Sequence, residues 1–204
     1  MIVPRCEVVL VLACGRGRRM GGPKAVMPIA DEPWWAAQRR AILATGRGDF
    51  WVLSQRVHDQ LGDALRDASG DDYTIADDRA PMFDSVLAGV RALESNPPPG
   101  VFVLPVDVPM PGADVLDALP GAGLVAVPGV RATPGHPLWL AWDWVCAHLL
   151  PCAHGRLDEL ARPHRRVVEV EDPRVVMNLN RPADARAYEA FLADETEAGF
   201  TDGK

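Results

Sequence analysis

The sequence lacks a hydrophobic run long enough to cross a membrane. A transmembrane helix needs about 18 consecutive apolar residues, whereas the apolar stretch near the start of the 204-residue chain covers only residues 8–14. Glu7 directly precedes this stretch, where a signal peptide would carry basic or apolar residues. We therefore expect no membrane span, no secretory signal and no lipoprotein anchor at Cys14.

Cysteine is also scarce. The four cysteines are Cys6, Cys14, Cys146 and Cys152. So few cysteines, in a chain without a recognisable signal peptide, are typical of a protein that stays reduced in the cytoplasm. We therefore predict a cytoplasmic protein.

Positive charge is in deficit, with 21 Lys and Arg against 28 Asp and Glu and a net charge of −7. Proteins that bind nucleic acid usually carry an extended basic surface, so the charge argues against a nucleic-acid partner. The acidic segment 194–204 is expected to be a mobile tail after a single domain over residues 1–193. The apolar fraction of 48% is ordinary for a globular protein.

Short apolar runs alternate with helical patterns along the domain. The runs typical of buried strands cover residues 8–12, 50–53, 101–104 and 124–127, and an edge strand is predicted at 167–170. The helical patterns cover residues 33–45, 57–68, 85–93 and 183–192. This alternation predicts a three-layer α/β/α, Rossmann-like fold with a mostly parallel sheet. Ligands of such folds bind beyond the carboxyl ends of the strands.

The first predicted strand leads into a segment rich in glycine and arginine. A dinucleotide fingerprint fails because Met20 stands where its last glycine should be, which argues against a dehydrogenase. A Walker loop fails because Ala25 replaces the hydroxyl residue that follows its lysine. Glycines still let backbone amides approach phosphate oxygens, and Arg19 and Lys24 can offset the charge of a triphosphate.

The residues Leu12-Ala13-Cys14-Gly15-x-Gly17-x-Arg19-Met20-Gly21-x-x-Lys24 resemble the signature loop of the molybdenum-cofactor nucleotidyltransferase-like (MobA/MocA-like NTP transferase) family. Cys14 replaces the usual Gly or Ala. The resemblance implies the fold of the nucleotide-diphospho-sugar transferases. It also implies transfer of a nucleoside monophosphate from a nucleoside triphosphate to a small phosphorylated acceptor, such as a molybdopterin-type cofactor, with release of pyrophosphate. The implied nucleotide-binding residues are Leu12, Ala13, Cys14, Gly15, Gly17, Arg19, Lys24 and Ser85.

Asp107 follows the third buried run, between Pro105 and Pro109. A lone carboxylate at the end of a strand, with a backbone restricted by proline, suits Mg²⁺ bound together with a nucleotide. Similar families carry an Asp-x-Pro motif here, and the resemblance implies that Asp107 is their metal-binding aspartate. It further implies a catalytic set of Lys24, Arg19 and Asp107.

Three further segments resemble family motifs in the family's order: residues 82–89, 135–138 and 178–184. The resemblance implies that Ser85 contacts the nucleotide, that His136 binds the acceptor and that Asn180 is a second metal ligand. Each residue also has a structural alternative. Asp84, Ser85 or Asn180 can cap a helix, and His136 can belong to a structural turn.

One family feature is missing from the chain. Related cytidylyltransferases often carry Gly-Asp-x-Gly after the acceptor helix, whereas residues 151–156 contain no Asp. This departure keeps a second hypothesis open, in which the chain is a catalytically degenerate nucleotide-binding or regulatory module. The sequence does not choose between CTP, GTP and another triphosphate as the donor. A pterin cofactor, a sugar phosphate and a small phosphorylated alcohol all stay open as the acceptor.

The region before this gap is rich in tryptophan, cysteine and histidine. A helix is expected over residues 139–150. The pairs Cys146-x-His148 and Cys152-x-His154 depart from standard zinc spacings, so we favour ordinary packing over a zinc site. Tryptophans are mostly core residues, but those at 139, 142 and 144 can also line an acceptor pocket or a dimer contact.

Overall fold

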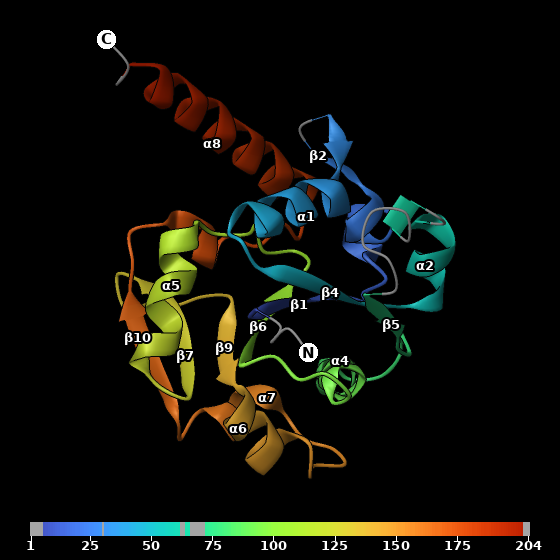
Figure 1. The fold of residues 1–204 in the computed structure, drawn as a ribbon. Coiled ribbons are helices and arrows are strands. Elements are labelled where there is room, and N and C mark those ends of the chain that lie inside the picture. Colours follow the sequence, from blue (N-terminus) through green and yellow to red (C-terminus); the bar gives the residue numbers. More distant parts are fainter. Residues whose placement is uncertain (1–5, 30, 62–63, 66–71, 202–204) are drawn as a thin grey trace.

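The computed structural model describes residues 6–29, 31–61, 64–65 and 72–201, and the side chains of these residues up to 195. Its central sheet has the strand order β10-β7-β9-β6-β1-β4-β5, and β8 pairs with β7 (Figure 1). The strands are β1 (Val8–Ala13), β4 (Gly48–Leu53), β5 (Tyr73–Ile75), β6 (Gly100–Pro105), β7 (Val125–Val130), β8 (Thr133–Pro134), β9 (Leu138–Ala141) and β10 (Arg165–Glu169).

Most strand pairs are parallel. β1 runs parallel to both β4 and β6, β4 to β5, and β10 to β7, whereas β9 runs antiparallel to β6 and β7. A separate hairpin joins β2 (Pro28–Ile29) to β3 (Glu32–Pro33). The predicted mostly parallel α/β sheet is confirmed.

Helices cover both faces of the sheet (Figure 1). They are α1 (Trp34–Ala44), α2 (Gln55–Leu61), α4 (Met82–Leu93), α5 (Ala113–Ala122), α6 (Trp142–Trp144), α7 (Leu157–Ala161) and α8 (Pro182–Thr201). Short turns of other helix types are η1 (Arg18–Met20), η2 (Lys24–Val26), η4 (Pro173–Val176) and the π-helical η3 (Val145–Leu149). Helices α1, α2, α5 and α8 pack on one face, and α4, α6 and α7 on the other.

The strand β1 shows why its sequence is continuously apolar. All six of its residues are buried. Val9, Val11 and Ala13 belong to the core layer under α1, whereas Leu10 and Leu12 belong to the layer under α4. Because side chains alternate along a strand, a strand with helices on both faces needs apolar residues at every position.

The chain changes sides of the sheet next to β1. The connections from β1 to β4 and from β4 to β5 pass through α1 and α2 on one face, whereas the connection from β5 to β6 passes through α4 on the other. A reversal of this kind leaves a crevice beyond the carboxyl ends of the two central strands. The loops that follow β1 and β6 meet there.

The prediction of a helix over residues 139–150 is wrong at its start. Residues 138–141 form β9, and Leu138 pairs with Val103 of β6. The helical turns begin only at Trp142. Long-range strand pairing, which a local pattern does not reveal, overrides the helical spacing here.

The C-terminal helix is longer than predicted. α8 continues beyond Leu192 to Thr201 and projects from the body of the molecule (Figure 1). It therefore includes much of the segment 194–204, whose mobility stays a prediction.

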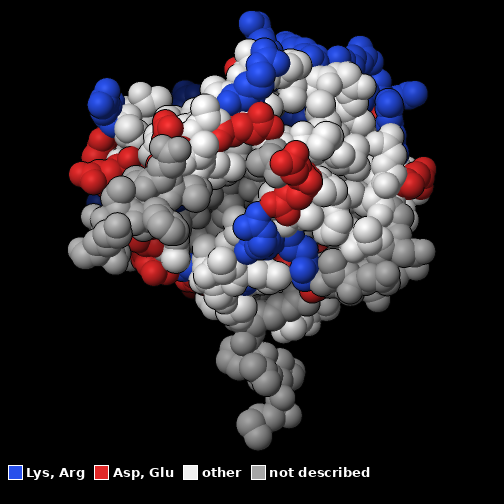
Figure 2. Space-filling model, turned by 90° about the horizontal axis from the view of Figure 1, so that it is seen from above, with Lys and Arg blue, Asp and Glu red and all other residues white. Residues whose placement is uncertain are grey.

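Within the described part of the chain, no helix is long and apolar enough to span a bilayer. Acidic and basic side chains are interspersed over the face shown in Figure 2.

Candidate active site

A cavity of about 440 Å³ opens at the crevice beyond β1 and β6. Its wall is built by the loop after β1, by the turn before α4, by the first turn of α4 and by the loop after β6. The described lining residues are Leu12, Cys14, Gly15, Arg16, Gly17, Arg18, Arg19, Lys24, Asp77, Asp78, Ala80, Met82, Ser85, Pro105, Val106, Asp107 and Asn180.

The glycine loop has a backbone that only glycine accommodates at one position. Gly17 has φ +58°, and its carbonyl accepts hydrogen bonds from the amides of Met20 (2.8 Å) and Gly22 (3.3 Å). A Cβ on Gly17 would lie 1.7 Å from the Gly22 carbonyl oxygen. Gly17 therefore folds the loop back so that Arg19 and Lys24 can both line the cavity.

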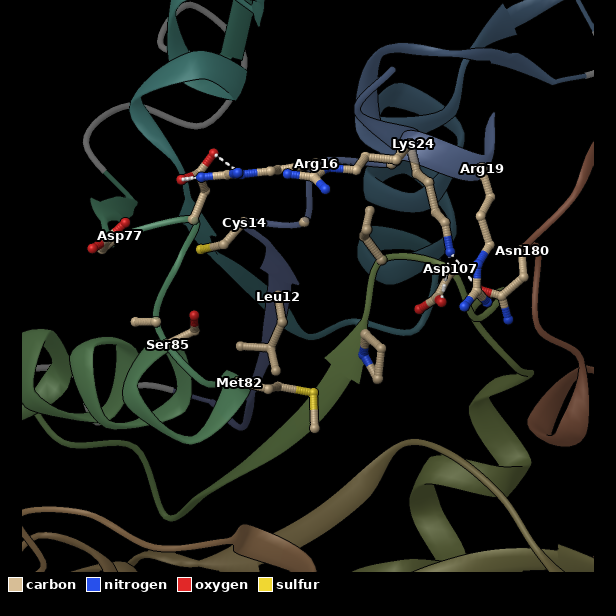
Figure 3. A pocket seen from close by; sticks show the side chains of 17 residues that line it. Leu12, Cys14, Arg16, Arg19, Lys24, Asp77, Met82, Ser85, Asp107 and Asn180 are labelled. Atoms are coloured by element: carbon tan, nitrogen blue, oxygen red, sulfur yellow. Dashed lines mark hydrogen bonds and ion pairs between the residues drawn. The ribbon is translucent and has the colours of Figure 1, made fainter. Parts of the chain in front are cut away.

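A cation and two oxygens converge at one end of the cavity (Figure 3). Lys24 Nζ lies 2.8 Å from Asp107 Oδ2 and 2.7 Å from Asn180 Oδ1. These oxygens come from the loop after β6 and from the segment before α8. Two hard oxygen donors already surround one positive charge, so the donor set also fits Mg²⁺, which proteins hold through one or two such ligands.

Backbone hydrogen bonds bring Asn180 to this position. The amide of Leu179 donates to the Asp107 carbonyl at 2.7 Å. Asp184 Oδ2 accepts from the amides of Asn180 (2.9 Å) and Arg181 (2.8 Å). Asp184 thus satisfies amide groups at the start of α8, and the Asn180 side chain remains directed at Lys24.

Acidic side chains lie at the opposite end of the cavity (Figure 3). Arg16 donates through Nε and Nη2 to the two carboxylate oxygens of Asp78, both at 2.8 Å. This hydrogen-bonded ion pair lowers the pKa of Asp78. Asp77 lies beside it on the same turn, and its carboxylate accepts from the Arg79 amide at 2.9 Å.

Cys14 and Ser85 form the floor near this acidic end. Burial raises the pKa of Cys14, and its thiol donates to the Val52 carbonyl at 3.4 Å. Ser85 is buried within the first turn of α4, where Pro81 stands at the N-cap and no side chain caps the helix. The alternative that Asp84 or Ser85 caps this helix is therefore not observed.

A second cavity, of about 510 Å³, adjoins the first at Met82, which lines both. His136 lines this second cavity together with Arg156 and Arg165. Burial lowers the pKa of His136, and the negative charge of Asp107 offsets part of that effect. Among the described residues, His136 Nδ1 is buried without a hydrogen-bond partner.

Most of the sequence-predicted site residues thus meet in the first cavity. Ala13 instead packs in the core layer under α1, and His136 lies in the second cavity. Sequence reasoning missed Asp77 and Asp78, because it predicted no strand over residues 73–75, which form β5 just before them. The segment that lacks the family carboxylate, residues 151–156, contributes Gly155 and Arg156 to the second cavity.

The cysteines and histidines of residues 146–154 make ordinary local contacts. Cys152 Sγ donates to the His148 carbonyl at 3.0 Å, and the His148 ring lies 4.7 Å from the His164 ring. Over the described residues, no group of three or more His, Cys, Asp or Glu side chains is arranged to hold a metal ion. Trp139, Trp142 and Trp144 pack into the two core layers.

The sheet, its crevice and the charged cavity form a fold and a site that can hold a nucleotide. The match to a family of nucleotidyltransferases identifies the class. The sequence profile of the MobA-like NTP transferase domain matches residues 9–175, and the chain belongs to this family. The resemblance seen in the glycine loop is thereby confirmed.

Individual relatives agree with this assignment. A molybdenum cofactor guanylyltransferase from Cereibacter sphaeroides is 29% identical over 199 residues, which cover 90% of this chain and 95% of that protein. A nucleotidyl transferase structure from Methanothermobacter covers 93% of this chain and 99% of its own, with 22% identity and a TM-score of 0.71. A Mycobacterium tuberculosis protein in complex with manganese has 19% identity and a TM-score of 0.63, with coverage of 89% and 97%. Both structures share the fold.

Proposed function

We propose that this nucleotidyltransferase is a guanylyltransferase that transfers GMP from GTP to the phosphate of a molybdopterin-type acceptor, with release of pyrophosphate. One observation carries the proposal. Lys24 Nζ lies within 2.8 Å of both Asp107 Oδ2 and Asn180 Oδ1, in a cavity beyond the strand ends. The likeness to a curated molybdenum cofactor guanylyltransferase supports the choice of acceptor.

The acidic end of the cavity supports guanine as the base. Asp78 accepts two parallel N–H donors from Arg16. Guanine presents the same pair of donors side by side, N1–H and one N2–H, whereas the other common bases place an acceptor beside their donor. A carboxylate that binds a planar fork of two donors is therefore suited to select guanine. We assign the recognition of guanine to Asp78. When guanine binds, its two N–H donors take the place of the two donors of Arg16.

The opposite end of the cavity then receives the triphosphate. The backbone of the glycine loop approaches the phosphates, and Arg19 and Lys24 offset their charge. Asp107 and Asn180 are the side chains that would hold Mg²⁺. When it is bound, Mg²⁺ supplies Lewis-acid stabilisation of the charge on the phosphates.

The second cavity is assigned to the acceptor. Its position beside Met82 places it next to the nucleotide cavity. Arg165 and Arg156 bring positive charge to its wall, although Arg156 also donates to the Asp158 carboxylate at 3.1 Å. The lowered pKa of His136 keeps its imidazole neutral at pH 7, so that it can donate or accept a hydrogen bond. The segment 151–156, which lacks the Gly-Asp-x-Gly carboxylate, contributes Arg156 to this wall, and a cation suits a phosphorylated molecule.

The reaction needs no covalent intermediate with the protein. An acceptor phosphate oxygen, already ionised at pH 7, forms a bond to the α-phosphorus of GTP, and the bond from that phosphorus to the β-phosphate oxygen breaks. The electron pair of the broken bond leaves with pyrophosphate. The protein positions the two phosphates and stabilises the charge that develops between them.

The four free cysteines support a cytoplasmic location.

The donor is tested by thermal unfolding with ATP, CTP, GTP, UTP and dTTP, each with and without Mg²⁺. A ligand that binds only the folded protein at 100 times its Kd stabilises it by about 2.7 kcal/mol. We expect the largest shift in Tm with GTP and Mg²⁺. A larger shift with CTP would contradict the assignment of guanine. Binding of GTP without release of pyrophosphate in the presence of molybdopterin would identify a nucleotide-binding module instead of an enzyme.

A further inference from the structure

Helix α1 lies between the segments that carry the cation and its two oxygens, yet none of its residues lines the first cavity. Its first residue, Trp34, donates through its backbone amide to the Met27 carbonyl at 2.8 Å. The Met27 amide in turn donates to the Lys24 carbonyl at 3.1 Å. The start of α1 is therefore fixed to the short turn that carries Lys24.

The side chain of Trp34 reaches the other two segments. Its indole Nε1 donates to the Val106 carbonyl at 2.5 Å, directly before Asp107. Its ring contacts Tyr188 of α8 edge-on, with ring centres 5.5 Å apart and an interplanar angle of 81°. A single residue thus touches the Lys24 segment, the Asp107 loop and the helix that follows Asn180. Its exposed fraction is 2%.

Gln38 lies one helical turn further along the same face of α1. Its Nε2 donates to the Val108 carbonyl at 2.6 Å, and its Oε1 accepts from the Met110 amide at 2.9 Å. Gln38 is 1% exposed. Together with Trp34, it holds the backbone on both sides of Asp107.

The Asp107 loop depends on such donors because of its sequence. Pro105 and Pro109 have no amide hydrogen, and the loop has no strand or helix to satisfy its buried carbonyl groups. Buried carbonyls require a hydrogen-bond partner. For Val106 and Val108 that partner is a side chain of α1, so α1 holds the loop on both sides of Asp107. The Asp107 carbonyl itself accepts from the Leu179 amide.

We propose that Trp34 and Gln38 are positioning residues for the transfer reaction, which set the Asp107 carboxylate relative to Asn180 and Lys24. This inference rests on the proposed role of Asp107 in holding the metal ion. It assigns to α1 an effect on metal binding and on turnover, and none on recognition of the base, because α1 lies at the cation end of the cavity.

The test compares two matched substitutions, Trp34→Phe and Trp139→Phe. Both remove an indole donor from a buried tryptophan, since Trp139 Nε1 donates to the Gly123 carbonyl at 3.1 Å and the residue is 4% exposed. Trp139 lies on β9, outside both cavities. The two variants therefore share the loss of a buried hydrogen bond and of part of an aromatic contact, and they differ in what the bond holds.

Three quantities are measured at a temperature at which both variants are folded: the Kd for Mn²⁺ in the presence of GTP, kcat for transfer, and KM for GTP. For Trp34→Phe we expect roughly 10- to 100-fold weaker Mn²⁺ binding and a similar fall in kcat, the usual size of effects on groups that orient metal ligands. KM for GTP should stay within about threefold of wild type, and Trp139→Phe should leave all three values within about threefold. Equal effects of the two variants would overturn the inference.

Gln38→Met provides an independent test if Trp34→Phe does not fold. It removes both hydrogen bonds to the Asp107 loop at a similar side-chain volume, and the same weakening of Mn²⁺ binding is expected. A Gln38→Met protein with wild-type Mn²⁺ binding would overturn the inference. If wild-type protein transfers no nucleotide, the proposed function fails, but the comparison of Mn²⁺ affinities still decides the role of Trp34 and Gln38.

Discussion

The ammonium group of Lys24 lies 2.8 Å from the carboxylate of Asp107, although the two residues are 83 positions apart in the chain. Both side chains are largely buried. In this arrangement the lysine occupies the point on which two oxygen donors converge. A metal ion that uses the same oxygens must therefore compete with the ammonium group. Removing the ammonium group should change the affinity for the metal ion in a direction that can be measured.

Lys24→Met should change metal binding and turnover in opposite directions. Without the ammonium group, Asp107 and Asn180 are freed, and Mn²⁺ should bind more tightly to the nucleotide-free protein. Transfer should fall by roughly two orders of magnitude, because a charge that stabilises the transition state is lost. Electron paramagnetic resonance of Mn²⁺ and a transfer assay provide the two readouts.

Arg91→Met is the matched control for this prediction. Arg91 lies exposed near the end of α4, outside the cavity, and its loss changes the net charge equally. It should alter neither quantity. Weaker Mn²⁺ binding in Lys24→Met would show that the two oxygens do not form the metal site.

Asp78→Asn should reduce the preference for GTP. The amide keeps the shape of the carboxylate but replaces one acceptor with a donor, which repels one N–H of guanine. We expect kcat/KM for GTP to fall roughly 10- to 100-fold, the effect of losing a charged hydrogen bond, with little change for ATP. Asp59→Asn, an exposed change on α2, serves as the control. An unchanged ratio of GTP to ATP activity would remove Asp78 from base selection.

Gly17→Ala should distort the glycine loop, whereas Gly22→Ala should not. A Cβ on Gly17 meets a backbone oxygen at 1.7 Å and the residue has φ +58°, but a Cβ on Gly22 meets no atom within 4 Å. Strain of this kind costs about 1–3 kcal/mol. Urea unfolding should show this loss for Gly17→Ala alone, together with at least about tenfold weaker GTP binding. Equal stability of the two variants would contradict the loop geometry.

His136 should make stability depend on pH. The ordinary pKa of 6.5 applies to the unfolded chain, whereas burial lowers the pKa of His136 in the folded protein. As the pH falls below 6.5, the unfolded chain gains a proton that the folded chain does not, so the free energy of unfolding decreases. Stability is therefore greatest above pH 6.5 and is lost towards the lower, folded-state pKa.

Urea unfolding of wild type and of His136→Gln, at pH values on both sides of 6.5, measures this effect. The variant should lose less stability on acidification, because it has no group that titrates at this position. The other histidines contribute equally to both proteins. The same pH dependence in the two proteins would show that His136 is not buried in a neutral form.

The sequence predicted the sheet well because its central strands are buried on both faces. Such strands are apolar at every position, as β1 is, and stand out without knowledge of their partners. The antiparallel strand β9 is harder to predict from the sequence. The local pattern predicts a helix that includes most of β9, because the signal that makes β9 a strand is its pairing with β6, which a local pattern does not contain.

The residues of the candidate site are predicted to lie together only where they belong to a short motif. The glycine loop and Asp107 follow strands directly, and their residues meet as expected. The pairing of Arg16 with Asp78 joins residues 62 positions apart, and the contacts of Trp34 depend on how α1 packs. Such relationships depend on tertiary structure, which pattern reasoning from one sequence does not supply.

The most direct test of the account is to identify the product of the reaction. Purified protein is incubated with Mg²⁺, molybdopterin and either GTP or CTP, and the products are analysed by mass spectrometry, with Asp107→Asn as the inactive control. With GTP we expect a guanine dinucleotide of the cofactor and one pyrophosphate per product. A cytosine dinucleotide, or no product while GTP is bound, would contradict the proposed function.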